Sequence, residues 1–91
     1  PNGQNSFGGY SNSLVVNQKF ALKIPASLDP QFVGPILCAG VTTYSPLKHW
    51  GAGPGKMVAV VGFGGLGHMA SQIASAMGAE VTVISSTKDK E

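Results

Sequence analysis

The pattern of apolar and polar positions is clearest in the second half of the chain. Residues 56–61 form an apolar run that predicts a buried strand, and residues 81–84 predict another. The intervening residues 66–77 predict a helix. Its apolar residues recur at spacings of three and four and so share one face: Met69, Ile73, Ala76 and Met77. Gly78 is expected to end this helix. Strand, helix and strand together predict a βαβ unit with parallel strands.

A parallel sheet covered by a single helix is not a complete domain, because parallel sheets are normally buried on both faces. The sequence therefore predicts the start of a doubly wound α/β sheet. The residues expected to pack between the sheet and its helices are Val58, Val60, Val61, Ile73, Val81, Val83 and Ile84. Tyr44 and Trp50 are also interpreted as packing residues.

The first half of the chain is less regular. Residues 1–9 are rich in Asn, Gly and Ser and predict a loop. Two short apolar runs, at residues 13–16 and 20–24, predict two strands joined by a turn.

Two helical stretches are expected next. Asp29 is suited to cap a helix and Pro30 to occupy its first position, so a helix is predicted over residues 30–38. A second stretch at residues 41–48 contains Pro46, which a helix tolerates in its first turn but which kinks it further on.

Composition narrows the class of protein. Of the 91 residues, 43% are hydrophobic, which is enough for a packed core, but only 11% are charged. Globular domains usually have about a quarter of their residues charged. Much of this surface is therefore expected to be covered by other protein, which indicates that the chain is a segment of a larger one.

Charge and cysteine content argue against several functions. The net charge is +2, and the lysines are scattered apart from Lys88 and Lys90, so no basic face is available for nucleic acid. The longest apolar run, residues 57–63, is far too short to span a bilayer. The single cysteine, Cys38, cannot form an internal disulfide, and no signal-peptide pattern opens the sequence. A cytoplasmic protein is expected.

Residues 62–67 read GFGGLG and match the pattern G-x-G-x-x-G. They follow a predicted buried strand and open a predicted helix, the context in which this pattern indicates dinucleotide binding. Gly62 permits a tight turn, Gly64 lets the backbone approach a diphosphate, and Gly67 lets the helix pack close to the strand. The diphosphate would lie on the helix N-terminal amides, where the peptide dipoles favour an anion. A glycine-rich connection in another βαβ fold is the alternative.

The end of the second predicted strand indicates which dinucleotide is bound. An NAD site has an acidic residue about 20 positions after the glycine motif. Here the strand runs instead into SSTKDK at residues 85–90. Hydroxyl and ammonium groups suit the 2′-phosphate of NADP, which a carboxylate would repel. NADP is therefore preferred, although Asp89 lies nearby and a solvated loop is the simpler alternative.

Four motifs, in this order, are similar to those of a known family: LCAGVTTYSPL at residues 37–47, GFGGLGH at residues 62–68, AMGA at residues 76–79 and VISS at residues 83–86. The chain resembles the cinnamyl alcohol dehydrogenase-like, NADP-dependent branch of the zinc-dependent medium-chain alcohol dehydrogenases. The resemblance extends from GGYS at residues 8–11 to the last residue.

This resemblance implies a two-domain enzyme. Residues 1–39 would be the end of a GroES-like, β-rich catalytic domain, and residues 40–91 the start of an NADP-binding Rossmann domain. Such enzymes interconvert primary alcohols and aldehydes, aromatic or aliphatic, by zinc-assisted hydride transfer. The intact enzyme would act on a small molecule and would be a homodimer.

The resemblance also implies roles for single residues. Cys38 matches a ligand of the catalytic zinc. Thr42, one helical turn later, matches a residue beside the nicotinamide and is the candidate catalytic residue. The residues expected to contact NADP are Thr42, Gly62, Gly64, Gly65, Leu66, Gly67, Ser85, Ser86, Lys88 and Lys90. Lys88 and Lys90 compete for the same contact with the 2′-phosphate.

A catalytic zinc of this type needs three protein ligands. The family's other ligands, and its four-cysteine structural zinc lobe, are expected upstream of residue 1, so the chain alone is expected to be inactive. By composition alone, Cys38 is a buried small residue, His49 a surface residue and His68 a helix N-terminal residue. Two alternatives stay open: a zinc-free, NADPH-dependent quinone reductase-like enzyme, and a nucleotide-binding fragment without chemistry.

Overall fold

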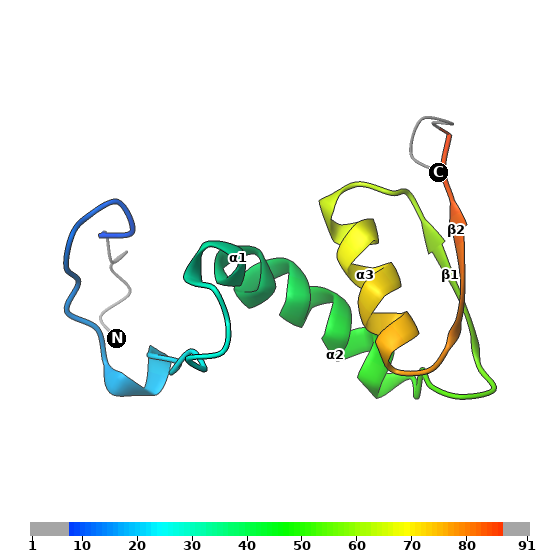
Figure 1. Ribbon diagram of the computed structural model, residues 1–91, viewed down its shortest axis with the longest axis horizontal. Helices are drawn as coiled ribbons and strands as arrows, with labels where there is room; N and C mark the ends of the chain where they lie inside the picture. Colours follow the sequence, from blue (N-terminus) through cyan, green and yellow to red (C-terminus); the bar gives the residue numbers. More distant parts are fainter. Residues whose placement is uncertain (1–7, 87–91) are drawn as a thin grey trace, which may run out of the picture.

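The computed structural model describes residues 8–86, with helices in the middle of the chain and a small sheet at its end (Figure 1). Its elements, in chain order, are a 3-10 helix at Gln18–Phe20, helix α1 at Pro30–Pro35, a π-helix at Ile36–Gly40, helix α2 at Val41–His49, strand β1 at Met57–Val61, helix α3 at Gly65–Ala76 and strand β2 at Glu80–Ile84.

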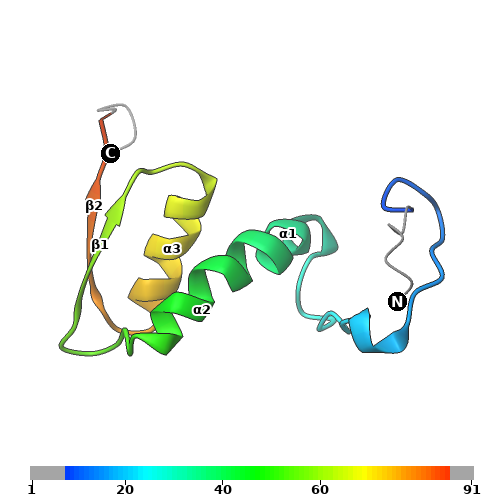
Figure 2. The same ribbon diagram turned by 180° about the vertical axis from the view of Figure 1, so that it is seen from behind.

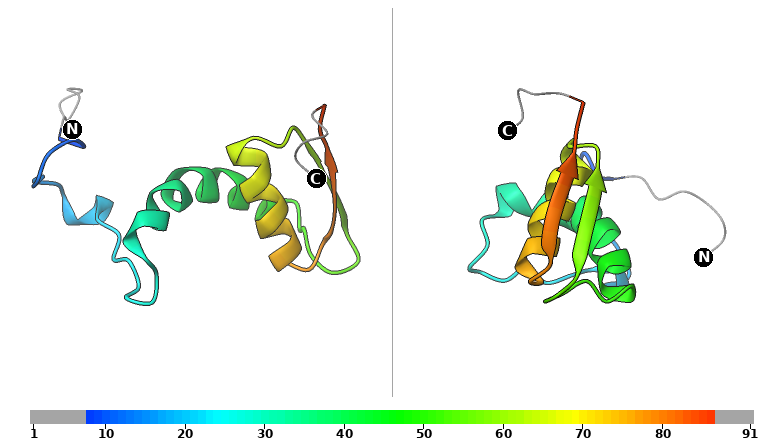
Figure 3. Two further views of the ribbon diagram at one scale, coloured as in Figure 1. Left: turned by 45° about the horizontal axis from the view of Figure 1, so that its top comes forward. Right: turned by 90° about the vertical axis from the view of Figure 1, so that its right-hand side faces the viewer.

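The predicted strand, helix and strand are confirmed, each boundary within one residue of its expected place. β1 and β2 form a parallel pair in which Val58 lies opposite Val81 and Val60 opposite Val83. Helix α3 contacts both strands and lies on one face of this sheet, and α2 contacts α3 (Figure 3). The chain therefore has a mixed α/β fold built around one βαβ unit.

Glycine ends α3 as predicted. Gly78 has a φ of +88°, and its N–H donates to the Ser75 carbonyl at 2.9 Å. The N–H of Ala79 donates to the Ala74 carbonyl at 3.1 Å. This pair of hydrogen bonds around a left-handed residue is the Schellman motif, which satisfies the last carbonyls of a helix. It turns the chain directly into β2.

The core lies between α3 and the covered face of the sheet. Of the predicted packing residues, only Val60 is buried, at 9% exposed, whereas Val58, Ile73 and Val81 are half-buried. Ala74 is 0% exposed, while Ala76, which was predicted on the buried face, is exposed. Ala74 is therefore the most deeply buried residue of the helix.

The face of the sheet that α3 does not cover explains why several residues that were predicted to pack are exposed. Val61 and Ile84 lie opposite each other and remain 81% and 54% exposed. Side chains alternate between the two faces of a strand, so Val61 points away from the α3 side, where Val60 is buried. No described element covers that outer face (Figure 3). Val83 is also partly exposed, at the open end of the sheet.

The two predicted strands before α1 are absent, because no described residue before Met57 is in a strand. This part of the chain extends away from the sheet (Figure 2). The Asn17 side chain accepts from the Lys19 N–H at 3.0 Å and caps the 3-10 helix in place of the expected hairpin. Val15 is 102% exposed. β-propensity depends on packing partners, and this segment has none here, so the expected β-rich character of residues 1–39 does not appear in residues 8–39.

The helical segment in the middle begins as predicted but does not stop at residue 38. Asp29 caps α1 by accepting from the Gln31 N–H at 3.1 Å, and Pro30 is the first helical residue. Pro35 lacks the N–H that an α-helix would donate to the Gln31 carbonyl, and the wider π-helix starts directly after it. This π-helix continues without a loop into α2, which contains Pro46.

No helix within residues 8–86 is long and apolar enough to cross a membrane.

Candidate functional site

The candidate site is the turn that links β1 to α3. Gly62 has a φ of +89°, a conformation that side chains rarely adopt, so the turn depends on glycine here. Its N–H donates to the Ile84 carbonyl at 2.8 Å and extends the sheet by one hydrogen bond. The turn therefore begins in fixed register with the end of β2.

Gly67 lies against the beginning of the same turn. A Cβ atom on Gly67 would be 2.0 Å from the Gly62 carbonyl oxygen and 3.5 Å from a methyl carbon of Val60. No side chain fits in that space without moving the helix or the strand. The sequence predicted this close approach of helix to strand for the last glycine of the motif.

The two middle glycines face open space. Nothing lies within 4 Å of a Cβ atom built on Gly64 or Gly65, and Leu66 is exposed. Gly64 occupies the cap position of α3, and no side chain caps the helix. Because the first amides of a helix have no intrahelical acceptor, the turn presents N–H groups to an open surface. A diphosphate fits this arrangement in charge and in space.

Ser85 and Ser86 follow β2 at the same edge of the sheet as this turn. The carboxyl ends of parallel strands meet at one edge, and the hydrogen bond from Gly62 to Ile84 fixes how the two ends lie. Both serines are exposed. The structure thus brings them beside the glycine turn, while Lys88 and Lys90 lie outside the described residues.

The two residues assigned to catalysis lie on the helical segment before β1. Cys38 is in the π-helix, and Thr42 follows in the first turn of α2. Both are exposed, so the interpretation of Cys38 as a buried residue is wrong. The π-helix contacts α3, which places the cysteine-bearing segment beside the helix that starts at the glycine turn. π-helical turns are rare and occur frequently at functional sites.

Within residues 8–86 there is no group of three His, Cys, Asp or Glu side chains that could hold a metal ion. Cys38 would contribute one sulfur ligand. The described residues alone do not fit a zinc ion, which needs at least three protein ligands. His49 instead makes an edge-to-face contact with Trp50, with ring centroids 5.0 Å apart.

Two residues near these segments make contacts that the sequence did not predict. The buried Thr43 hydroxyl donates to the carbonyls of Ala39 at 2.7 Å and Gly40 at 3.1 Å, which ties α2 to the end of the π-helix. His68, in the first turn of α3, contacts the ring of Phe63 in the glycine turn. The Thr43 contact is the usual bonding of a helical threonine hydroxyl to the carbonyls three and four residues earlier, whereas the His68 contact depends on the path of the loop, which no periodic pattern predicts.

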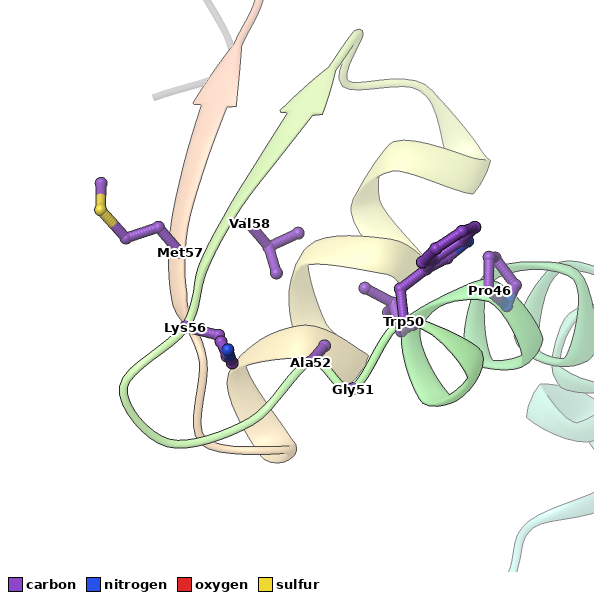
Figure 4. Close-up of a pocket in the computed structure, with 8 residues that line it drawn as sticks. Pro46, Trp50, Gly51, Ala52, Lys56, Met57 and Val58 are labelled. Atoms are coloured by element: carbon purple, nitrogen blue, oxygen red, sulfur yellow. The ribbon is translucent and has the colours of Figure 1, made fainter.

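A groove of about 270 Å³ lies at the start of β1, beside the end of α2 (Figure 4). Its lining residues are Pro46, Leu47, Trp50, Gly51, Ala52, Lys56, Met57 and Val58. Trp50 is 82% exposed and Tyr44 is exposed as well, so the packing prediction for both is wrong in this chain. The groove lies at the opposite end of β1 from the glycine turn and does not belong to the candidate site.

No protein-family model matches the chain. The sequence is 57% identical over 89 residues to a probable formaldehyde dehydrogenase from Bacillus subtilis, and the alignment covers 98% of this chain and 26% of that protein. It is also 57% identical over 88 residues to an NADP-dependent alcohol dehydrogenase from Mycolicibacterium smegmatis, with 97% and 25% of the two chains covered. A probable zinc-type alcohol dehydrogenase-like protein of Acanthamoeba polyphaga mimivirus is 50% identical, with 99% and 21% covered.

The fold matches a solved structure of a cinnamyl alcohol dehydrogenase from Sorghum bicolor with a TM-score of 0.79 and 51% sequence identity, over 82% of this chain and 22% of that one. The chain spans about a quarter of the length of the first curated relatives it matches. The resemblance inferred from the motifs is thereby confirmed in sequence and in fold.

Proposed function

We propose, from its homology to NADP-dependent and cinnamyl alcohol dehydrogenases, that this chain is a segment of a zinc-type alcohol dehydrogenase that interconverts primary alcohols and aldehydes with NADP(H). The observation that carries the proposal is the glycine turn. Gly67 leaves no room for a side chain beside Gly62, nothing lies within 4 Å of the Cβ positions of Gly64 and Gly65, and no side chain caps the first amides of α3. This is the geometry that binding of a dinucleotide diphosphate requires.

The βαβ unit would be the start of a Rossmann domain. Its parallel strands, the turn at the carboxyl end of β1 and the helix that begins there support this assignment. Gly62, Gly64, Gly65, Leu66 and Gly67 would surround the diphosphate. The division into a catalytic part at residues 1–39 and a nucleotide-binding part at residues 40–91 belongs to the same proposal.

NADP would be bound in preference to NAD. Ser85 and Ser86 lie beside the glycine turn, at the place where an NAD site carries a carboxylate. Hydroxyl groups can donate hydrogen bonds to the 2′-phosphate oxygens without the repulsion that a carboxylate would add. The name of the Mycolicibacterium relative agrees with this preference. Lys88 or Lys90 would add a positive charge to the same phosphate.

Cys38 would provide one thiolate ligand to a catalytic zinc, and Thr42 would lie beside the nicotinamide. Both are exposed and close in sequence, so each side chain is accessible to a ligand. A bound zinc supplies Lewis acid chemistry, because it polarises an aldehyde carbonyl or favours deprotonation of an alcohol. The remaining ligands would come from outside residues 8–86, because the described residues form no cluster that could hold a metal ion.

The intact enzyme would be a homodimer acting on small alcohols and aldehydes, as the resemblance implies. It would be cytoplasmic, as the single cysteine suggests, and the 91-residue chain alone would be inactive. A zinc-free quinone reductase-like enzyme receives no support from the relatives' names.

The experiment that tests this function is an assay of the full-length protein with NADPH and two aldehydes, cinnamaldehyde and formaldehyde, together with its zinc content. We expect aldehyde-dependent oxidation of NADPH by protein that contains zinc, and loss of activity after treatment with a chelator. Activity that survives complete removal of zinc, or reduction of quinones but of neither aldehyde, would contradict the proposal.

A further inference from the structure

The glycine turn is spanned by a contact between two rings. Phe63 lies inside the turn, directly after Gly62, and His68 lies in the first turn of α3. Their ring centroids are 5.5 Å apart and the ring planes are inclined by 59°. The ring contact therefore spans residues 64–67, in which the Cβ positions of Gly64 and Gly65 are open.

His68 is itself held in place by its surroundings. Its backbone N–H donates to the Gly64 carbonyl at 2.8 Å, and its own carbonyl accepts from the Ser71 hydroxyl at 2.8 Å. Its Nε2 lies 3.0 Å from the Nε2 of Gln72, one helical turn later. With the Gln72 amide donating, the Nε2 of His68 accepts and the ring proton is on Nδ1. The ring that meets Phe63 is thus also in contact with Gln72 on α3.

The turn needs such a contact because its own sequence gives it little order. Four of the residues 62–67 are glycine, and glycine loses more conformational freedom on ordering than any other residue. Gly64 and Gly65 touch nothing at their Cβ positions, and Leu66 is exposed. The contact of Phe63 with His68 is therefore one of the interactions that connect the turn to the first turn of α3, together with the backbone hydrogen bond from His68 to Gly64.

We propose that His68 is a positioning residue for the dinucleotide. Its ring holds Phe63 and so keeps the amides of residues 64–67 aligned before the diphosphate arrives. Pre-ordering of a binding loop raises affinity because less freedom is lost on binding. The inference rests on the proposed function for the identity of the ligand, but the ordering of the turn does not depend on it.

The test compares His68→Ala, which removes the ring, with His68→Phe, which keeps a ring at the same place, in the full-length protein. Aromatic contacts of this kind correspond to roughly a fivefold change in an equilibrium constant. We expect the Kd for NADPH to rise about fivefold in His68→Ala and to stay near the wild-type value in His68→Phe. Ser75→Ala, on the exposed side of the same helix, is the matched control and should bind NADPH like wild type.

A second ligand separates positioning from a general loss of structure. Adenosine 2′-monophosphate has no diphosphate and would bind near Ser85 and Ser86. Its Kd should be the same in His68→Ala and wild type, whereas a general weakening of the fold would raise both constants. Equal NADPH binding by His68→Ala and wild type, or an equal loss for the two ligands, would overturn the proposal.

Hydrogen exchange of the nucleotide-free protein tests the ordering of the turn without any ligand. Amides of residues 64–67 should exchange faster in His68→Ala than in wild type or His68→Phe, while amides of β1 exchange at the same rate in all three. Unchanged exchange in the turn would reject the role of His68. A wild-type protein that binds no NADPH would instead count against the proposed function, and the exchange rates would still decide the role of His68.

Discussion

A Cβ atom on Gly67 would lie 2.0 Å from the carbonyl oxygen of Gly62. This distance is far shorter than any van der Waals contact, so the last glycine of the motif is required by packing inside the protein itself. The absence of a side chain at Gly67 lets the first turn of α3 approach the end of β1 closely, and the Cβ positions of Gly64 and Gly65 between them remain open.

Gly67→Ala should destabilise the protein and weaken its binding of NADPH. The added methyl group must displace the turn or the helix, and overpacking of this kind usually costs about 1–3 kcal/mol. Thermal unfolding and NADPH titration of the full-length protein measure the two effects. Gly65→Ala is the matched control for stability alone, because nothing lies within 4 Å of a Cβ atom there. Equal stability of the two variants would show that the turn accommodates the added methyl group at no cost, and would contradict this expectation.

Thr43→Val should lower the free energy of unfolding by about 1 kcal/mol, the usual net contribution of a buried hydrogen bond. The hydroxyl donates to the carbonyls of Ala39 and Gly40, and valine has the same shape without the donor. Thr43→Ser keeps the hydroxyl and its hydrogen bonds, so its free energy of unfolding should be closer to that of wild type. Denaturant unfolding of the three proteins makes the comparison. If Thr43→Val were as stable as wild type, these two hydrogen bonds would have no net effect.

Local signals predicted the elements of the fold well. Asp29 and Pro30 mark the start of the helical segment, and Gly78 marks the end of α3, because each acts through its own backbone geometry or cap. The motif glycines likewise predicted the tight turn and the close approach that the structure contains. Such features are readable because they depend on neighbours in sequence.

Features that depend on distant partners were not predictable. The apolar run around Val15 indicated a strand, but without a second strand to pair with it the segment stays extended and exposed. Val61 and Ile84 were expected in a core, but the covering layer for their face is not part of the described chain.

Ser85→Asp should change the cofactor preference. A carboxylate beside the glycine turn would repel the 2′-phosphate of NADPH and could accept hydrogen bonds from the ribose of NADH. We expect the Kd for NADPH to rise at least about tenfold, equivalent to about 1.4 kcal/mol, while NADH binds at least as tightly as before. Ser85→Ala is the control and should weaken NADPH binding less. An unchanged ratio of the two constants in Ser85→Asp would place the 2′-phosphate elsewhere.

Cys38→Ala should remove catalytic zinc from the full-length protein and abolish its activity, but should barely affect stability. The side chain is exposed, so its removal leaves no cavity in the core. Metal analysis, an activity assay and thermal unfolding measure the three quantities. Leu37→Ala, a change at the neighbouring exposed position, should retain zinc. Full zinc content and activity in Cys38→Ala would exclude the sulfur as a ligand.

The most direct test of the proposed nucleotide site is a titration of the full-length protein with NADPH and NADH under identical conditions. Open amides at the start of α3 and the two serines after β2 predict that both nucleotides bind and that NADPH binds more tightly. Tighter binding of NADH would contradict the assignment of the serines to the 2′-phosphate. Binding of neither nucleotide would contradict the assignment of the glycine turn itself.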